Sequence, residues 1–157
     1  METEVRFREV QQFRQPWLWG LLGAQALLVA VSLVRGRRSA RATARRLLVL
    51  GGVALFFRSA TLYTEVRDEG VYVKFAPLHR SFRRIPFSAL ADVQATGYSP
   101  LRYGGWGVRW SPSGVAYTVS GRSGVRLERA NGRSVFVGSD RPDELLAAVQ
   151  DTTRREV

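Results

Sequence analysis

The chain has 157 residues, of which 45% are hydrophobic, and it carries 24 basic against 13 acidic side chains. It is too apolar for a disordered chain, and the lack of cysteine excludes a disulfide scaffold, thiolate metal sites and cysteine nucleophiles. The net charge of +11 is compatible with binding to nucleic acid, or with a membrane protein whose flanking arginines set its orientation.

The first apolar run extends from Trp17 to Val34, which is 18 residues without a charged side chain. As a helix this run would be about 27 Å long, close to the ~30 Å hydrocarbon core of a bilayer. Trp17 and Trp19 at its start are typical of the aromatic belt at a membrane interface. No small-residue cleavage site follows the run, so a secretory signal fits less well. The pattern predicts a transmembrane helix over about residues 17–34.

Six arginines follow within residues 35–46. A loop in contact with anionic lipid head groups accounts for them, and a nucleic-acid-binding arm is the alternative. The segment has no aromatic side chains and lies between two apolar runs, which favours the loop. We expect all of its arginines except Arg41 to anchor the chain at the membrane interface together with Trp17 and Trp19: Arg35, Arg37, Arg38, Arg45 and Arg46.

The second apolar run, Leu47 to Phe57, is too short to span a bilayer by itself. Extended to Tyr63 it reaches about 26 Å, provided that the Arg58 side chain snorkels towards the interface. The sequence therefore predicts a second span over about residues 47–63 and a transmembrane helical hairpin. On this interpretation residues 1–60 are a membrane anchor and residues 61–157 are a separate domain.

From Thr61 the hydrophobic pattern has a period of two, which is typical of β-strands. Residues 62–67 and 71–75 flank a turn and predict a hairpin, and Asn131-Gly132 predicts a two-residue type I′ turn. An amphipathic helix is predicted near the carboxyl terminus. The expected fold class is α+β: a transmembrane hairpin followed by a mainly antiparallel, pleckstrin-homology (PH)-like β-barrel with one C-terminal capping helix. The remaining strands are expected near residues 80–85, 92–98, 103–110, 115–119, 125–129 and 134–137.

Several stretches resemble a known family: FREVQQFRQPWLW (7–19), LYTEVRDEGVYVKFAPLHRSFRRIPF (62–87), YGGWGVRW (103–110) and AYTVSGRSGVRLERANGRSVFVGSDRPDEL (116–145). The chain resembles an uncharacterised prokaryotic family in which two transmembrane helices precede a bacterial PH-like domain. The resemblance covers nearly the whole chain and implies a fold and a membrane topology. It implies no biochemical activity.

Catalytic residues are not predicted. His79 is the only histidine, so a His-rich metal site is impossible, and the chain has no G-x-S-x-G motif. The glycines of residues 103–107 lack the Lys-Ser/Thr pair that follows a phosphate-binding loop. We therefore expect no enzyme, no cofactor and no metal.

One basic cluster is a candidate site for a phosphorylated head group. It combines residues of one predicted strand with a lysine of the preceding strand: His79, Arg80, Arg83, Arg84 and Lys74. A solvated strand face, or a sheet edge protected by charge, is the alternative. The expected function is that of a membrane-anchored, non-catalytic adaptor that binds a lipid head group or a protein partner at the bilayer surface. The alternative is a nucleic-acid-binding protein that uses residues 35–46.

Two arguments about orientation conflict. The Lys and Arg counts place residues 35–46 in the cytoplasm and the domain outside. The resemblance places the domain in the cytoplasm. A single crossing by residues 17–34, with Leu47–Phe57 in the membrane interface, would satisfy both. We expect a cell-membrane protein whose domain is cytoplasmic, with lipids and an unidentified protein as partners and no nucleic acid.

Overall fold

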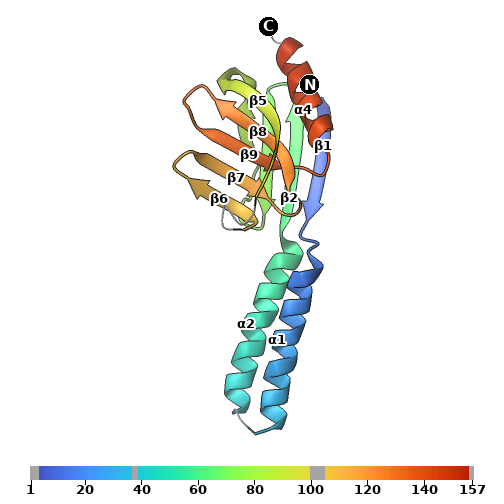
Figure 1. Ribbon diagram of the computed structural model, residues 1–157, viewed down its shortest axis with the longest axis vertical. Coiled ribbons are helices and arrows are strands. Elements are labelled where there is room, and N and C mark those ends of the chain that lie inside the picture. The colour runs from blue at the N-terminus through green and yellow to red at the C-terminus, as the bar shows by residue number, and fades with distance from the viewer. Residues whose placement is uncertain (1–3, 37–38, 100–104, 156–157) are drawn as a thin grey trace. The chain divides into compact units, whose positions relative to one another are not determined.

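The computed structural model describes residues 4–36, 39–99 and 105–155. It divides into two compact units (Figure 1). Residues 13–59 form a helical unit, and the residues up to Gln12 together with those from Ala60 onward form a β unit. Two of the predicted interface arginines, Arg37 and Arg38, lie outside the described residues, as does part of the predicted strand at 103–110.

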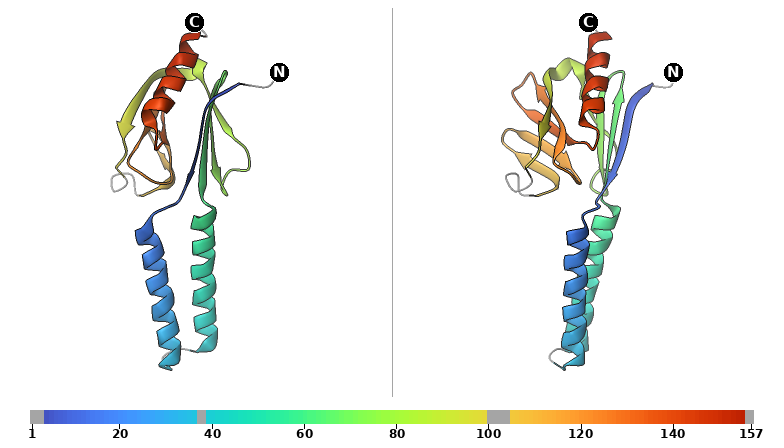
Figure 2. Two further views of the ribbon diagram at one scale, coloured as in Figure 1. Left: turned by 90° about the vertical axis from the view of Figure 1, so that its right-hand side faces the viewer. Right: turned by 45° about the vertical axis from the view of Figure 1, so that its right-hand side comes forward.

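The helical unit consists of α1 (Pro16–Val34) and α2 (Ala40–Ser59), which lie side by side (Figure 2). Helix α1 begins with Pro16. The first N–H groups of a helix have no partner within it, so the missing N–H of proline costs no hydrogen bond there. The hydroxyl of Ser39 accepts a hydrogen bond from the Ala42 N–H, 3.3 Å away, and so caps the start of α2.

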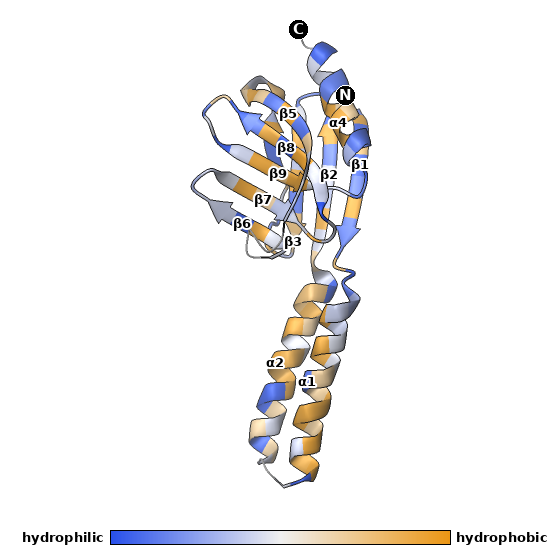
Figure 3. Ribbon diagram, in the orientation of Figure 1, coloured by the Kyte–Doolittle hydropathy of each residue, from blue (hydrophilic) through white to orange (hydrophobic). Residues whose placement is uncertain are grey.

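In the described part of the chain only α1 is long and apolar enough to cross a membrane, and this rests on length and composition alone. The first half of α2 contains Arg41, Arg45 and Arg46, and its last turn contains Arg58. Figure 3 shows this difference, with α1 hydrophobic along most of its length and α2 hydrophilic at its start. The predicted second span is therefore wrong, and with it the transmembrane hairpin.

Sheet A of the β unit is antiparallel, in the order β1-β2-β3-β4. The predicted hairpin at 62–75 is confirmed, and its inward side chains, among them Leu62, Val66 and Val73, are fully buried. Only the end of the strand predicted at 80–85 is extended, so Arg80 does not share a strand with Arg84. The strands are β1 (Val5–Gln12), β2 (Thr61–Arg67), β3 (Gly70–Ala76) and β4 (Arg83–Pro86).

Strand β1 was not expected from the sequence. Its buried side chains are Phe7, Glu9 and Gln11, so two of three inward positions are polar and the hydrophobic alternation is lost. The Glu9 carboxylate accepts hydrogen bonds from the Ser139 hydroxyl (2.6 Å) and the Asp140 N–H (2.9 Å), just before the C-terminal helix. The boundary at residue 60 stays a prediction for the membrane anchor, but the β unit includes β1.

The helical unit connects two neighbouring strands of sheet A. Strands β1 and β2 are in register from Val5 opposite Arg67 to Gln12 opposite Thr61, and the helical unit lies between them in the chain. The orientation of the chain relative to a membrane stays a prediction.

Sheet B has the order β5-β8-β9-β7-β6, with β7 and β9 parallel. Strand β9 inserts between β8 and β7. Within the described residues β4 pairs only with β3 and β6 only with β7, so the two sheets do not close into a barrel. The predicted closed PH-like barrel is therefore wrong. A short 3-10 turn (Phe87–Ala89) separates the sheets in sequence. The elements are β5 (Leu90–Gly97), β6 (Gly107–Ser111), β7 (Gly114–Thr118), β8 (Ser123–Arg129), β9 (Ser134–Gly138) and the helix α4 (Pro142–Arg155).

Helix α4 packs against β5 and β8 of sheet B and against β1 and β2 of sheet A. Its Leu145 and Val149 are fully buried, as are Val125 and Leu127 of β8. Figure 2 shows the two sheets as separate layers with α4 beside both. The C-terminal helix therefore joins the two sheets into one core, which confirms the prediction that this segment is an amphipathic helix.

The turn between β8 and β9 differs from the predicted type I′ turn. The Gly132 N–H donates to the Arg129 carbonyl (2.9 Å), and Gly132 has φ +78°, but no non-glycine residue in the described segments has a positive φ. Asn131 therefore occupies an ordinary turn position, and its side-chain oxygen accepts a hydrogen bond from the Arg133 N–H (3.0 Å). A positive φ is therefore needed only at Gly132, which is the last residue of the turn that starts at Arg129.

Replacing Gly132 by valine is expected to destabilise the β unit by about 1–2 kcal/mol, because valine resists a positive φ. No other atom lies within 4 Å of the Cβ that would be added, so the cost is conformational. Gly132→Asn is the control, since asparagine tolerates this conformation. Thermal unfolding measures both variants, and equal melting temperatures for Gly132→Val and wild type would contradict this geometry.

Candidate anion-binding site

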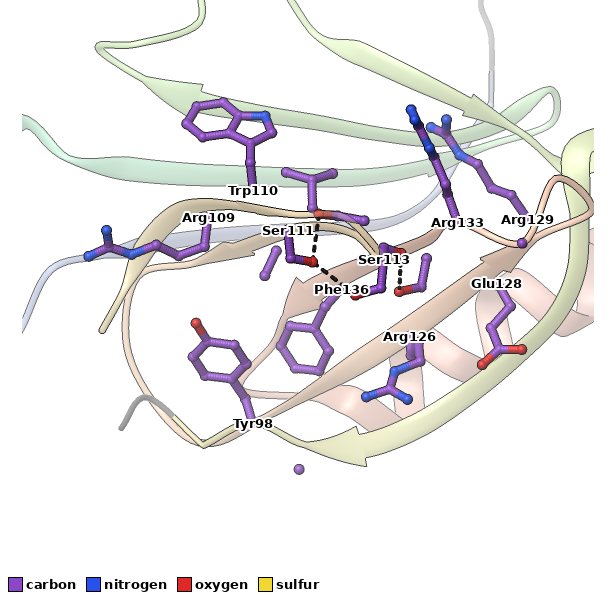
Figure 4. A pocket seen from close by; sticks show the side chains of 16 residues that line it. Tyr98, Arg109, Trp110, Ser111, Ser113, Arg126, Glu128, Arg129, Arg133 and Phe136 are labelled. Carbon is purple, nitrogen blue, oxygen red and sulfur yellow. Dashed lines mark hydrogen bonds between the residues drawn. The ribbon is translucent and has the colours of Figure 1, made fainter. Parts of the chain in front are cut away.

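The outer face of sheet B carries a cavity of about 480 Å³ (Figure 4). The register places Arg126 of β8 opposite Phe136 of β9, Phe136 opposite Ala116 of β7, and Ala116 opposite Arg109 of β6. Side chains that are directly opposite lie on the same face of a sheet. Four strands therefore contribute to one lined surface, with charged residues at both sides and small or aromatic residues at its centre.

Two aromatic rings form an apolar part of this surface. Tyr98, just after β5, stacks on Phe136 with a centroid distance of 5.0 Å and an interplanar angle of 24°, and both side chains are buried. The Tyr98 hydroxyl donates to the Gly105 carbonyl, 2.8 Å away. A Cβ at Gly124 would lie 2.6 Å from Cζ of Phe136, so glycine at this position leaves room for the ring. The aromatic pair is thus held by its surroundings.

Four arginines line the cavity, and Glu128 is the single acidic residue in its lining. None of the four forms a salt bridge with a carboxylate in the described segments. Nε of Arg129 is buried and has no hydrogen-bond partner there. Buried charged donors usually have an anionic partner, because an unpaired one is costly. The arrangement therefore favours an anionic ligand near the arginines of the lining: Arg109, Arg126, Arg129 and Arg133. Figure 4 shows that Arg129 and Arg133 point to the other side of the sheet from Arg126.

A second basic cavity, of about 540 Å³, lies beside the first and shares part of its lining. It is bounded by Arg83 and Arg84 of β4 in sheet A, and by Arg129 and Arg133 of the β8–β9 hairpin. Its lining contains no acidic residue. The Arg84 side chain pairs with Glu69 at 2.9 Å, and this hydrogen bond raises the pKa of Arg84 above its usual value.

Of the predicted head-group residues, Arg83 and Arg84 line the second cavity, and Lys74, His79 and Arg80 line neither cavity. The ammonium of Lys74 lies over the rings of Tyr63 (5.7 Å) and Phe82 (5.9 Å). Arg80 is exposed. The structure therefore does not bring the five residues into one site, and their role in binding stays a prediction.

The described interface anchors of the helical unit are accessible to solvent. Trp17 is 55% exposed and Trp19 is half-buried. The described arginines of this group are all exposed: Arg35, Arg45 and Arg46. Whether these side chains contact lipid stays a prediction.

His79 packs edge-on against Tyr117, and its Nδ1 accepts a hydrogen bond from the Phe75 N–H, 3.3 Å away. Burial lowers the pKa of His79 below its usual 6.5, and the positive charge of Arg83 lowers it further. Because folding depresses this pKa, the neutral form stabilises the β unit above pH 6.5, and that stability is lost as the pH falls through the folded pKa.

A nuclear magnetic resonance titration of this single histidine is expected to give a pKa below 6.5 in the folded protein and near 6.5 in urea. Arg83→Ala should raise the folded value part of the way, because it removes a nearby positive charge. Arg122→Ala is the control, since Arg122 is exposed and lines neither cavity. A folded pKa at or above 6.5 would contradict the burial of the ring.

The four arginines of the first cavity were missed because they come from two separate segments of the chain, β6 and the β8–β9 hairpin. Part of the signal is visible in β8, where Val125 and Leu127 are buried and alternate with Arg126 and Glu128 on the other face. That alternation places a charge on the outer face. It does not show that β6 and the β8–β9 turn bring further arginines to the same place.

Fold and site together define an α+β protein. Its described residues contain one apolar helix of spanning length and an arginine-lined cavity on a five-stranded sheet. The chain belongs to the family of unknown function DUF6141, whose family model matches residues 1–154. No curated protein and no solved structure matches the chain.

Proposed function

We propose that the protein is a membrane-tethered, non-catalytic module that binds a phosphate-bearing ligand in the cavity on the outer face of sheet B. The observation that carries this proposal is the group of four arginines with a single carboxylate in the same lining and no salt bridge in the described residues. Arginine forms paired, charge-assisted hydrogen bonds to phosphate oxygens. The aromatic centre of the cavity, Tyr98 on Phe136, offers an apolar surface to the rest of a ligand.

The membrane tether is supported by α1. Only 11% of its apolar 18-residue stretch is buried, and Leu21, Leu27 and Leu28 each expose more than half of their surface. A core helix of a soluble protein would bury most of this surface. A cleaved signal sequence is a poor alternative, because cleavage after α1 would also remove β1, which pairs with β2 and binds the start of the α4 segment through Glu9.

Extraction of membranes tests the tether. We expect the full chain to remain in the membrane fraction in 1 M salt, for which the Debye length is about 3 Å, and to be released by detergent. Release by salt alone would instead support nucleic-acid or peripheral binding through residues 35–46, since phosphate contacts weaken steeply with salt.

The location of the β unit in the cytoplasm stays a prediction. A reporter that is active only outside the cytoplasm, fused after Val157, is expected to be inactive. Strong activity of this reporter would contradict the cytoplasmic placement.

Ligand binding is tested with inorganic phosphate and the full chain in detergent micelles, by calorimetry. Removing a charged donor typically costs about 1.5–3 kcal/mol, which is roughly a 10- to 100-fold weaker binding constant. We expect this loss for Arg126→Ala and no change for Arg80→Ala, since Arg80 is exposed and lines neither cavity. Equal binding by both variants, or no binding by the wild type, would contradict the proposal.

A further inference from the structure

We propose that the second basic cavity, which is lined by residues of both sheets, binds an organic acid that carries an apolar group. This site lies on the inner face of sheet B, towards sheet A. It therefore goes beyond the proposed function, which concerns a phosphate-bearing ligand on the outer face. The ligand chemistry has two sources, a carboxylate and a phosphate monoester of an apolar molecule.

Each sheet directs an arginine into the space between the sheets. Arg83 of β4 is directly opposite the fully buried Val73 of β3, so both side chains lie on the inward face of sheet A. Arg129 of β8 lies two residues after the buried Leu127 and shares the inward face of sheet B. Figure 4 shows Arg129 on the opposite side of the sheet from Arg126. The two inward arginines therefore line one cavity from opposite sheets.

Tyr117 of β7 lies within electrostatic reach of both arginines. Its side chain is buried in the lining of the same cavity, and burial raises the pKa of its hydroxyl. The positive charges of Arg83 and Arg129 both oppose this shift. Two positive charges from different sheets thus act on one hydroxyl group, which can itself donate a hydrogen bond to an anion.

The chain does not balance the charge of this cavity. The described lining contains no acidic residue, and Arg83, Arg129 and Arg133 form no salt bridge within the described residues. Arg84, on the other face of β4, pairs with Glu69 instead. Nε of Arg129 is buried and has no partner in the described segments. This N–H and the adjacent Nη–H groups form the edge of a guanidinium that binds two oxygens of one carboxylate or phosphate.

Part of the lining is apolar, which selects the group that carries the acid. Trp110 of β6 is opposite Val115 of β7, and Val115 is opposite Val135 of β9, so the three side chains form a row on one face. Trp110 is 73% exposed, and sheet A adds the buried Ile85. A small inorganic anion would leave this row in water, whereas an apolar group would cover it. The cavity of about 540 Å³ has the size of an ordinary small-molecule site.

The experiment is a titration of the full chain in nonionic detergent micelles, followed by tryptophan fluorescence. The ligands are hexanoate and hexyl phosphate, with acetate and 1-hexanol as controls that lack the apolar chain or the charge. We expect one hexanoate or hexyl phosphate per chain, bound at least roughly tenfold more tightly than either control. The fluorescence change should be lost in Trp110→Phe, since this side chain is exposed in the cavity.

Arg83→Ala should weaken the binding of hexanoate roughly tenfold or more, because it removes one of the two facing charges. Arg126→Ala, on the opposite face of sheet B, should leave hexanoate binding unchanged, as should Arg122→Ala at an exposed position outside both cavities. His79 gives a second readout, because its ring packs edge-on against Tyr117. Burial and then the charge of Arg83 lower the pKa of His79, so an anion bound beside Arg83 should raise it.

The outcomes separate this inference from the proposed function. Equal affinity for hexanoate and acetate, or for hexanoate and 1-hexanol, would overturn it. Unchanged hexanoate binding by Arg83→Ala, or an equal loss in Arg126→Ala, would overturn the placement between the sheets. These results leave the binding of inorganic phosphate on the outer face, and its loss in Arg126→Ala, as a separate question. Binding of hexanoate or hexyl phosphate that depends on Arg83 supports the site, and the tighter of the two identifies the acid.

Discussion

Replacing Gly114 by alanine is expected to unfold the β unit, at a cost of about 4 kcal/mol or more. Gly114 has φ +148°, and a Cβ added there would lie 1.8 Å from the carbonyl oxygen of Ser134. That oxygen belongs to the backbone of the parallel strand β9, which cannot move without breaking its pairing with β7 and β8. Gly114 also lines both cavities, so the fold and the site depend on the same close approach.

Gly107→Ala is the matched control for Gly114→Ala. Gly107 also has a positive φ, +112°, but no atom lies within 4 Å of its added Cβ. It should therefore cost only the conformational strain, about 1–3 kcal/mol. Thermal unfolding of the full chain in micelles, followed by circular dichroism, compares the two. Equal destabilisation by both substitutions would contradict the contact between β7 and β9.

Deleting β1 is expected to have a second large effect. Residues 61–157 alone lack the strand that pairs with the whole of β2, buries Phe7 and supplies Glu9 to Ser139. The loss exposes the edge of β2 and leaves buried donors without their acceptor, so we expect an unfolded or aggregated fragment. The control is a protein that keeps β1 and in which a flexible linker replaces residues 13–59.

A short linker is sufficient because Gln12 and Thr61 are directly opposite each other in the register. Loops of two to five residues join such strands in ordinary hairpins. We expect the linked protein to be soluble, monomeric by gel filtration and cooperative in unfolding. A fragment 61–157 that is as stable as the linked protein would show that β1 is dispensable, and would contradict the role given to Glu9.

The alternation of apolar residues was sufficient to predict the strands that bury an apolar face. The β2–β3 hairpin and the helix α4 follow from it, because Leu62, Val66, Leu145 and Val149 are all inward. Strand β1 could not be found in this way, since Glu9 and Gln11 occupy inward positions, where Gln11 donates to Glu9 and Glu9 also accepts from the segment before α4. A strand that buries polar side chains does not show the alternation of apolar residues by which strands are predicted.

Pairing between distant strands was the second obstacle. A chain of strands joined by turns is most simply arranged in sequence order, but β9 lies between β8 and β7 and runs parallel to β7. This insertion leaves sheet B open and brings the β8–β9 turn near β6, so Arg129 and Arg133 line both cavities together with Trp110 of β6. Nothing in the local sequence specifies that placement, so the sequence analysis placed the candidate site at other residues: Lys74, His79, Arg80, Arg83 and Arg84.

The membrane interpretation depended on counting apolar residues. Residues 16–34 have no charge, and α1 remains the one candidate span in the described chain. For α2 the apolar count from Leu47 required the extension past Arg58 to Tyr63. The structure ends α2 at Ser59 and assigns the following residues to β2, so the extension that made a second span has no helix to support it.

The most direct test of the central claim is a spectrum of the arginine Nε–H groups of the full chain in micelles, with and without inorganic phosphate. The Nε of Arg129 has no partner in the described segments, so its signal should shift most on addition of phosphate. The signal is assigned by its loss in Arg129→Lys. A shift confined to the arginines that line the proposed cavity is the predicted result: Arg109, Arg126, Arg129 and Arg133. An unchanged Arg129 signal, or equal shifts for arginines outside the cavities such as Arg80 and Arg122, would contradict the account.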